Sequence, residues 1–158
     1  MFEMKEVFFS STFGGETLSL AAGIATIDKM RREPVIEKLW KTGYTLAAAA
    51  TDKIRQHGLS EEISLSGFHP WMLLQFNDHP LARKEAIRTL FLRCMQDRGV
   101  LITASHNVCY AHDGDDIAVV LNSYDGALAQ VRIEIDSGKL EANLPCPVIE
   151  MGVTTRTR

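Results

Sequence analysis

Hydroxyl residues and glycines gather near the N-terminus in a pattern that could bind a phosphate. Residues 10–12 read Ser-Ser-Thr, and they come directly before Phe13, the pair Gly14–Gly15 and an apolar run at helical spacing. Such a loop presents hydroxyls and free backbone N–H groups at a helix start, where the helix dipole adds partial positive charge. The spacing alone leaves two interpretations open, since a glycine pair before a helix is also typical of a tight turn.

Two histidines, His106 and His112, are the other candidates for chemistry, because imidazole exchanges protons near neutral pH. The remaining histidines fall at a helix end or in turns, and their spacing differs from metal-binding patterns such as HExxH. These are His57, His69 and His79. The sequence therefore predicts no metal site.

Four amphipathic helices are expected to position these residues, because apolar side chains recur at intervals of three and four. Pro34 separates the first two helices, since proline disfavours helix at the residue before it and suits a first turn. Asp113 stands three residues before Asp116, which is a weak form of the reciprocal cap that opens a helix. The expected helices cover about 17–31, 34–57, a segment around 87–94 that closes at Gly99, and 113–128.

Short apolar or alternating segments are expected to form strands between the helices. The sequence predicts strands at 63–68, 71–76 and 100–103, followed by a loop or irregular edge strand over 104–110. After Val131 the residues RIEID alternate, and a turn is expected at 136–138. This order predicts the α+β class, with a small mixed sheet covered by helices.

The composition indicates one folded domain, with 158 residues of which 46% are hydrophobic. The net charge of -3 and pI near 5.9 give no electrostatic reason to expect nucleic acid or an anionic membrane as partner. An odd set of cysteines without CxxC spacing fits a reducing compartment. These are Cys94, Cys109 and Cys146. The N-terminus lacks the pattern of an export signal, so we expect a cytoplasmic protein.

Two blocks of the sequence resemble a known enzyme family. The stretch SSTFGGETLSLAA at 10–22 is similar to the segment after the Schiff-base lysine in class III pyridoxal-phosphate (PLP) aminotransferases, most closely the branch of glutamate-1-semialdehyde 2,1-aminomutase. The stretch GVLITASHNVCYAHDGDD at 99–116 resembles the family's C-terminal strand, loop and helix start. The blocks occur in family order at about family spacing, and weaker similarity extends to about Gln130.

The resemblance implies a PLP cofactor, a homodimer and a fold like the C-terminal domain of fold-type I PLP enzymes. A family threonine at the position of Thr12 holds the cofactor phosphate of the neighbouring subunit, which implies cofactor contacts for Thr12, Phe13 and Gly14. Glu16 and Thr17 stand where much of the family has Asn-Pro. A carboxylate at that place would oppose a phosphate unless it points away.

The same resemblance implies how the chain is organised. Residues 1–16 would form an arm and cofactor-phosphate loop, residues 17–135 a C-terminal-type aminotransferase domain, and residues 136–158 a tail. The family's Schiff-base lysine would lie upstream of Met1, so the chain would hold no catalytic residue and be inactive alone. Its partners would be the large PLP domain and a small amino or keto substrate. The alternative is a non-catalytic remnant that acts as a dimerisation or partner-binding module.

In the family context, His106 could line the substrate entrance or lie at the surface, and His112 is interpreted as anchoring the loop to the last helix. True aminomutases of this branch carry a longer loop with a glutamate that meets the substrate amino group. The corresponding residues 105–110 are fewer here and include no acid. This departure favours a general aminotransferase over the aminomutase.

Overall fold

The computed structural model describes residues 14–150 and divides the chain into two compact units at Glu37–Lys38. In the first unit, helix α1 (Thr17–Arg32) confirms the first predicted helix. Basic residues in its last turn stabilise the helix, because their positive charge interacts favourably with the negative C-terminal end of the helix dipole. None of the residues of α1 is buried.

Helix α2 (Val35–Gln56) begins directly after Pro34, as the sequence predicts. Its buried stripe runs through Gly43, Leu46, Ala50 and Ile54, at intervals of three and four residues. The prediction that Ile36 lies on this stripe is wrong. Its side chain is exposed, and Val35 is the buried residue of the first turn.

Strands β1 (Ile63–Phe68) and β2 (Trp71–Phe76) form the predicted pair, an antiparallel hairpin in which Ile63 faces Phe76. Strand β3 (Ser105–Asn107) pairs antiparallel with β2, and Met72 faces His106. The strand order is β1-β2-β3, so every described pairing in this sheet is antiparallel.

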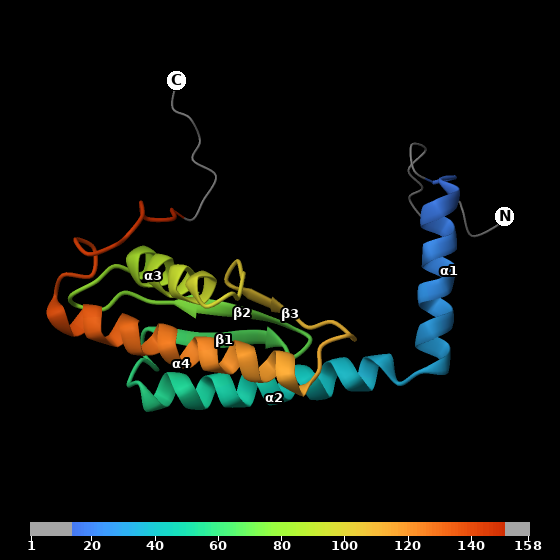
Figure 1. Ribbon diagram of the computed structural model, residues 1–158, viewed down its shortest axis with the longest axis horizontal. Helices are drawn as coiled ribbons and strands as arrows, with labels where there is room; N and C mark the ends of the chain where they lie inside the picture. The colour runs from blue at the N-terminus through green and yellow to red at the C-terminus, as the bar shows by residue number, and fades with distance from the viewer. Residues whose placement is uncertain (1–13, 151–158) are drawn as a thin grey trace, which may run out of the picture. The chain divides into compact units, whose positions relative to one another are not determined.

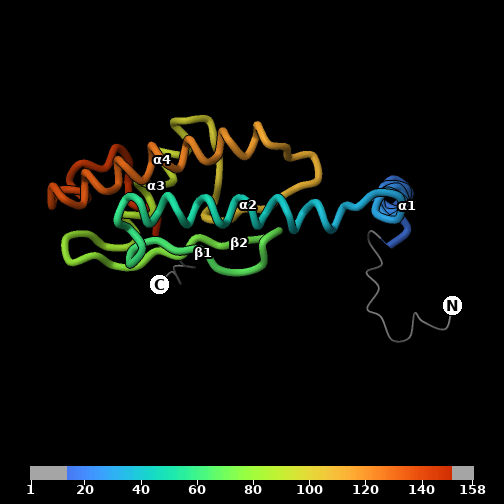
Figure 2. The backbone as a smooth tube through the Cα atoms, turned by 90° about the horizontal axis from the view of Figure 1, so that it is seen from below, coloured from blue at the N-terminus to red at the C-terminus, as the bar shows by residue number. Residues whose placement is uncertain are grey.

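One face of the sheet carries the buried side chains and the other carries exposed ones, as the two-residue period of a strand requires. Helices α2, α3 (Lys84–Asp97) and α4 (Gly114–Ser137) supply the residues that pack with the buried face. Figure 1 labels the strands among these helices, and Figure 2 shows β1 and β2 along one side of α2 and α4. The α+β arrangement with a helix-covered sheet is therefore confirmed, whereas the expectation of a mixed sheet is wrong, because the described sheet is antiparallel throughout.

One strand assignment from the sequence is wrong, and the last helix is longer than the sequence predicts. The segment 100–103 forms no strand, because the Val100 N–H group still bonds to the Met95 carbonyl at the end of α3, and Ala104 takes a left-handed conformation with φ 66°. The alternating residues after Val131 continue α4, where Val131 and Ile135 are buried one turn apart. The helix ends at Gly138, which takes the left-handed conformation with φ 65°.

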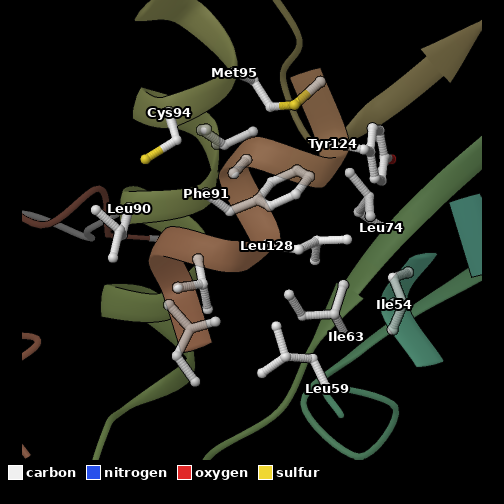
Figure 3. Close-up of a cluster of buried hydrophobic side chains, with 14 of the residues drawn as sticks. Ile54, Leu59, Ile63, Leu74, Leu90, Phe91, Cys94, Met95, Tyr124 and Leu128 are labelled. Atoms are coloured by element: carbon white, nitrogen blue, oxygen red, sulfur yellow. The ribbon is translucent and has the colours of Figure 1, made fainter. Parts of the chain in front are cut away.

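The main core lies between α3 and α4 and extends to β1, β2 and the end of α2. Figure 3 shows Phe91 of α3 and Leu128 of α4 in the middle of this cluster, with Tyr124 beside them. The rings of Phe91 and Tyr124 meet edge to face at 5.1 Å between centroids. This core holds α4 from Tyr124 onward. The start of α4 packs through Ile117 in a smaller cluster with Leu46 and Met72, and Met72 pairs with His106 of β3.

Candidate functional site

Of the three predicted cofactor contacts, Thr12 and Phe13 lie outside the described residues, and Gly14 is described in a turn just before α1. The site can therefore be built only from Gly14 onward. Glu16 is the N-cap of α1 and its backbone is extended. The sequence places the carboxylate of Glu16 at the start of α1, and in the structure this carboxylate caps the helix.

The Glu16 carboxylate accepts hydrogen bonds from the backbone N–H groups of Leu18 at 3.0 Å and of Ser19 at 2.5 Å. A hydrogen bond from the Ser19 side chain, together with these backbone bonds, lowers the pKa of Glu16 below its usual value. Two N–H groups of the first turn are therefore already taken by an anion. The N–H groups of Leu18 and Ser19 are therefore not free for another anion, and two of the three predicted cofactor contacts lie outside the described residues.

His106 is buried, with 6% of its surface exposed, so the interpretation of this residue as a surface histidine is wrong. Its Nε2 atom lies 2.5 Å from the hydroxyl of Tyr124, which is fully buried on α4. Burial lowers the pKa of His106 to about 4 and raises the pKa of Tyr124. The imidazole is therefore neutral at pH 7, and we assign the phenol as donor to Nε2.

A cavity of about 440 Å³ lies beside His106. The segment 100–103, β3, α2 and the first turn of α4 line it, so it joins elements that are far apart in sequence. Its wall is mainly apolar, with a few polar groups. The polar side chains are those of Thr103, Ser105, His106, Asn107, His112 and Asp116. Such a mixture suits a small organic molecule.

His112 lines the same cavity, and its Nδ1 atom accepts a hydrogen bond from the Cys109 N–H group at 3.2 Å. The reciprocal cap predicted at the start of α4 is present, since the side chains of Asp113 and Asp116 each accept from the other's backbone N–H group. These bonds fix the loop between β3 and α4. They support the interpretation of His112 as a structural residue.

The other histidines contact side chains of other segments. The Nε2 atom of His57 lies 3.0 Å from Oδ1 of Asp125, and the Nε2 atom of His79 lies 4.0 Å from a carboxylate oxygen of Glu62. The ring of His69 packs edge-on against Trp40 and Tyr44. Across residues 14–150, no group of His, Cys, Asp and Glu side chains is arranged to hold a metal ion.

Sequence reasoning missed one charged residue, Arg88 of α3. Its side chain is half-buried, and two of its nitrogen atoms lack a hydrogen-bond partner. The spacing of this arginine is typical of a solvent-facing residue of an amphipathic helix, so the sequence held no signal for it.

The described helices are too short or too polar to cross a membrane.

The chain is similar to curated proteins over most of its length. It is 30% identical over 128 residues to glutamate-1-semialdehyde 2,1-aminomutase of Methanococcoides burtonii, a match that covers 75% of this chain and 30% of the relative. It is 22% identical to 3-aminobutyryl-CoA aminotransferase of Cloacimonas acidaminovorans, covering 80% of this chain and 31% of that protein. No family model matches the chain.

Solved structures agree with these relatives. The PLP internal aldimine form of the Sphingopyxis sp. MTA144 FumI protein superposes with a TM-score of 0.70 and 26% identity, over 84% of this chain and 31% of FumI. An omega-transaminase from Sphaerobacter thermophilus shares the fold with a TM-score of 0.67 and 17% identity, over 80% of this chain and 31% of that one. The predicted resemblance is confirmed: the chain is related to the PLP-dependent aminotransferases and aminomutases, and it spans about 30% of the length of those relatives.

Proposed function

We propose that this chain supplies the C-terminal part of a PLP-dependent enzyme that transfers an amino group between an amino donor and a carbonyl acceptor. The observation that carries the proposal is the agreement of sequence and fold over the same large share of the chain, 75% in sequence and 84% in structure. The short loop at 105–110, without an acid, favours an aminotransferase over an aminomutase.

In this proposal, Thr12 donates its hydroxyl to the phosphate of a PLP bound by the neighbouring subunit, and Phe13 and Gly14 shape the loop. PLP supplies the electron sink for the chemistry, while the protein orients it. Glu16 limits how the phosphate would be held. Its carboxylate is kept ionised and occupies the N–H groups of Leu18 and Ser19, so the contacts would come from the loop before α1 and not from these groups.

The substitution Thr12→Val, made in the PLP-bound protein that contains this chain, tests the proposal. Valine keeps the β-branched shape and removes the hydroxyl, so one hydrogen bond to a charged phosphate is lost. The expected cost is about 1.5–3 kcal/mol, or roughly tenfold to a hundredfold in cofactor affinity. The measurement is a PLP titration beside a thermal melt.

Thr45→Val is the matched control, because the Thr45 hydroxyl bonds only to the Lys41 carbonyl on its own helix. It should leave cofactor affinity unchanged. If Thr12 only caps a turn, its substitution will lower the melting temperature and leave the PLP dissociation constant as it was. That outcome would refute the phosphate role.

Helix α1 offers a surface on which a second copy could pack. Leu20, Ile24, Ile27 and Met30 lie on one side of it at intervals of three and four, and each is between 46% and 62% exposed. Apolar stripes of this size are rarely left bare. We propose that the stripe forms part of the homodimer interface, which would also bring the preceding loop to the neighbouring subunit.

Ile24→Lys is therefore expected to shift the protein from dimer toward monomer in sedimentation at tens of micromolar, roughly where weak interfaces still populate. Ile133→Lys is the control, because Ile133 is a similarly exposed isoleucine on α4, at 59%. It should leave the association state unchanged. A wild-type chain that sediments as a monomer would count against the proposed interface.

The uncovered face of the sheet offers a second surface. Phe68 and Trp71 face each other across the hairpin, and Leu73 follows on the same face; all three are exposed. We propose that the large PLP domain packs against this face. The alternative function, a non-catalytic module that binds a partner, would use the same surfaces, and only the first proposal requires a PLP site that depends on Thr12.

A further inference from the structure

Arg88, in the middle of α3, carries a guanidinium that nothing in the described chain satisfies. Its Nε and Nη1 atoms are shielded from solvent and have no hydrogen-bond partner, and Arg88 takes part in no ion pair among residues 14–150. These two atoms carry three N–H donors, and the group stays charged throughout the pH range of a folded protein. A shielded, unpaired charge is unfavourable, so the arrangement requires an acceptor.

Neighbouring arginines show what Arg88 lacks. Arg93, on the same helix, forms an ion pair with Asp97 at 2.9 Å. Arg98 donates to the carbonyls of Cys94 and Gly126. The fold supplies acceptors to these two arginines. Among residues 14–150 it supplies none to the Nε and Nη1 atoms of Arg88.

Arg88 lines two cavities. The first, of about 420 Å³, lies between α3, the segment 101–103 and the segment 146–149. The second, of about 240 Å³, lies between β2, Ala104 and the first turns of α3. Both are large enough for a small organic molecule, since one water occupies about 30 Å³ of liquid.

The charged side chains around these cavities favour a ligand with a single negative charge. No acidic side chain lines the larger cavity, and the charge of Arg93 there is already met by Asp97. In the smaller cavity, Lys84 and Glu85 offset each other, and Glu85 forms no ion pair with Arg88. About one positive charge is therefore left over. This suits a carboxylate better than a dianionic phosphate.

The rest of the larger cavity is mainly apolar. Its apolar lining is Leu92, Leu101, Ile102, Pro147 and Ile149. The hydroxyl of Thr89 lies in the same wall, where it donates to the Glu85 carbonyl and accepts from the Ile149 N–H group. Such a wall would bury a hydrocarbon body while the guanidinium binds the acid.

We propose that Arg88 anchors a binding site for a small monocarboxylate with a short apolar body, seated between α3 and the segments 101–103 and 146–149. The site uses neither Thr12 nor the neighbouring loop, so it stands independently of the proposed cofactor role. A carboxylate would accept in a bidentate fork from Nη2 together with either Nε or Nη1, so that it satisfies one of the two orphan atoms. The apolar wall would favour butyrate over acetate.

The test follows the Nε–H resonance of Arg88 by nuclear magnetic resonance while butyrate, acetate or phosphate is titrated into the full chain at constant ionic strength and pH. We expect a saturable shift with butyrate, weaker binding of acetate and no saturable shift with phosphate. Calorimetric binding of butyrate should be lost in Arg88→Met. It should persist in Arg132→Met, because Arg132 lies on α4 outside both cavities and is paired with Asp136.

Tighter binding of phosphate than of butyrate would overturn the carboxylate assignment, and so would equal binding of butyrate by wild type and Arg88→Met. If neither butyrate nor acetate binds, the proposal that Arg88 anchors a site for a free small monocarboxylate is wrong. Should Arg88→Met fail to fold, Arg88→Lys keeps the charge while losing the bidentate fork. Butyrate affinity is then expected to fall by about tenfold, and an unchanged affinity would contradict the proposal.

Discussion

Replacing Gly43 with alanine is expected to destabilise the second unit strongly, although the same change usually stabilises a helix by about 1 kcal/mol. A Cβ atom at this position would lie 2.0 Å from the carbonyl oxygen of His69 and 2.4 Å from its carbonyl carbon. Both are backbone atoms of the tight turn between β1 and β2. They cannot move aside as a flexible side chain could, so either α2 or the hairpin must shift.

The same helix also holds the turn through side chains near Gly43, since the rings of Trp40 and Tyr44 pack against the His69 ring. Overpacking of this kind costs about 1–3 kcal/mol and sometimes more. Chemical denaturation followed by tryptophan fluorescence measures it. The control is Gly114→Ala at the start of α4, where an added Cβ meets nothing within 4 Å. Equal stability of Gly43→Ala and Gly114→Ala would show that helix and turn are not in this close contact.

Acidification is expected to destabilise the protein through His106. The pKa of this residue is about 4 in the folded state, against 6.5 for an ordinary histidine, because burial disfavours the charged form. Between these values the unfolded chain binds more protons than the folded one. The stabilisation is therefore complete above pH 6.5 and lost as the pH falls toward 4, by at most about 3 kcal/mol.

His106→Gln tests this expectation, because glutamine can still accept the Tyr124 hydrogen bond and cannot take up a proton. The fall in unfolding free energy between pH 7 and pH 4.5 should become shallower in this variant. If His106→Gln leaves the pH dependence unchanged, the buried histidine does not control it.

The sequence predicted the elements whose signals are local. Pro34 and the Asp113–Asp116 cap each placed a helix start correctly, because a break and a cap depend on nearby residues. The same reasoning assigned a strand to 100–103, where the backbone is still closing α3. Short β-branched runs carry no information about which groups their N–H bonds will reach.

The candidate site shows the same division. Thr12, Phe13 and Gly14 came from the resemblance to a family, and only Gly14 lies in the described part of the chain. The burial of His106 and the unpaired donors of Arg88 depend on contacts between segments far apart in sequence, namely β3 with α4 and α3 with the C-terminal segment. No local pattern encodes these contacts, so they could be found only from the fold.

The most direct test of the account is whether the isolated chain can hold PLP on one of its own lysines. In the proposed function, this chain supplies a contact to the cofactor phosphate, and the Schiff-base lysine lies elsewhere in the enzyme. Three described lysines already have partners, since Lys29 pairs with Glu33, Lys53 pairs with Asp125 and Lys38 donates to the Tyr110 carbonyl. The measurement is borohydride reduction after incubation with PLP and dialysis, then peptide mapping by mass spectrometry beside a transaminase assay. We expect no transaminase activity and no stoichiometric label, whereas one fully labelled lysine in an active protein would contradict the account.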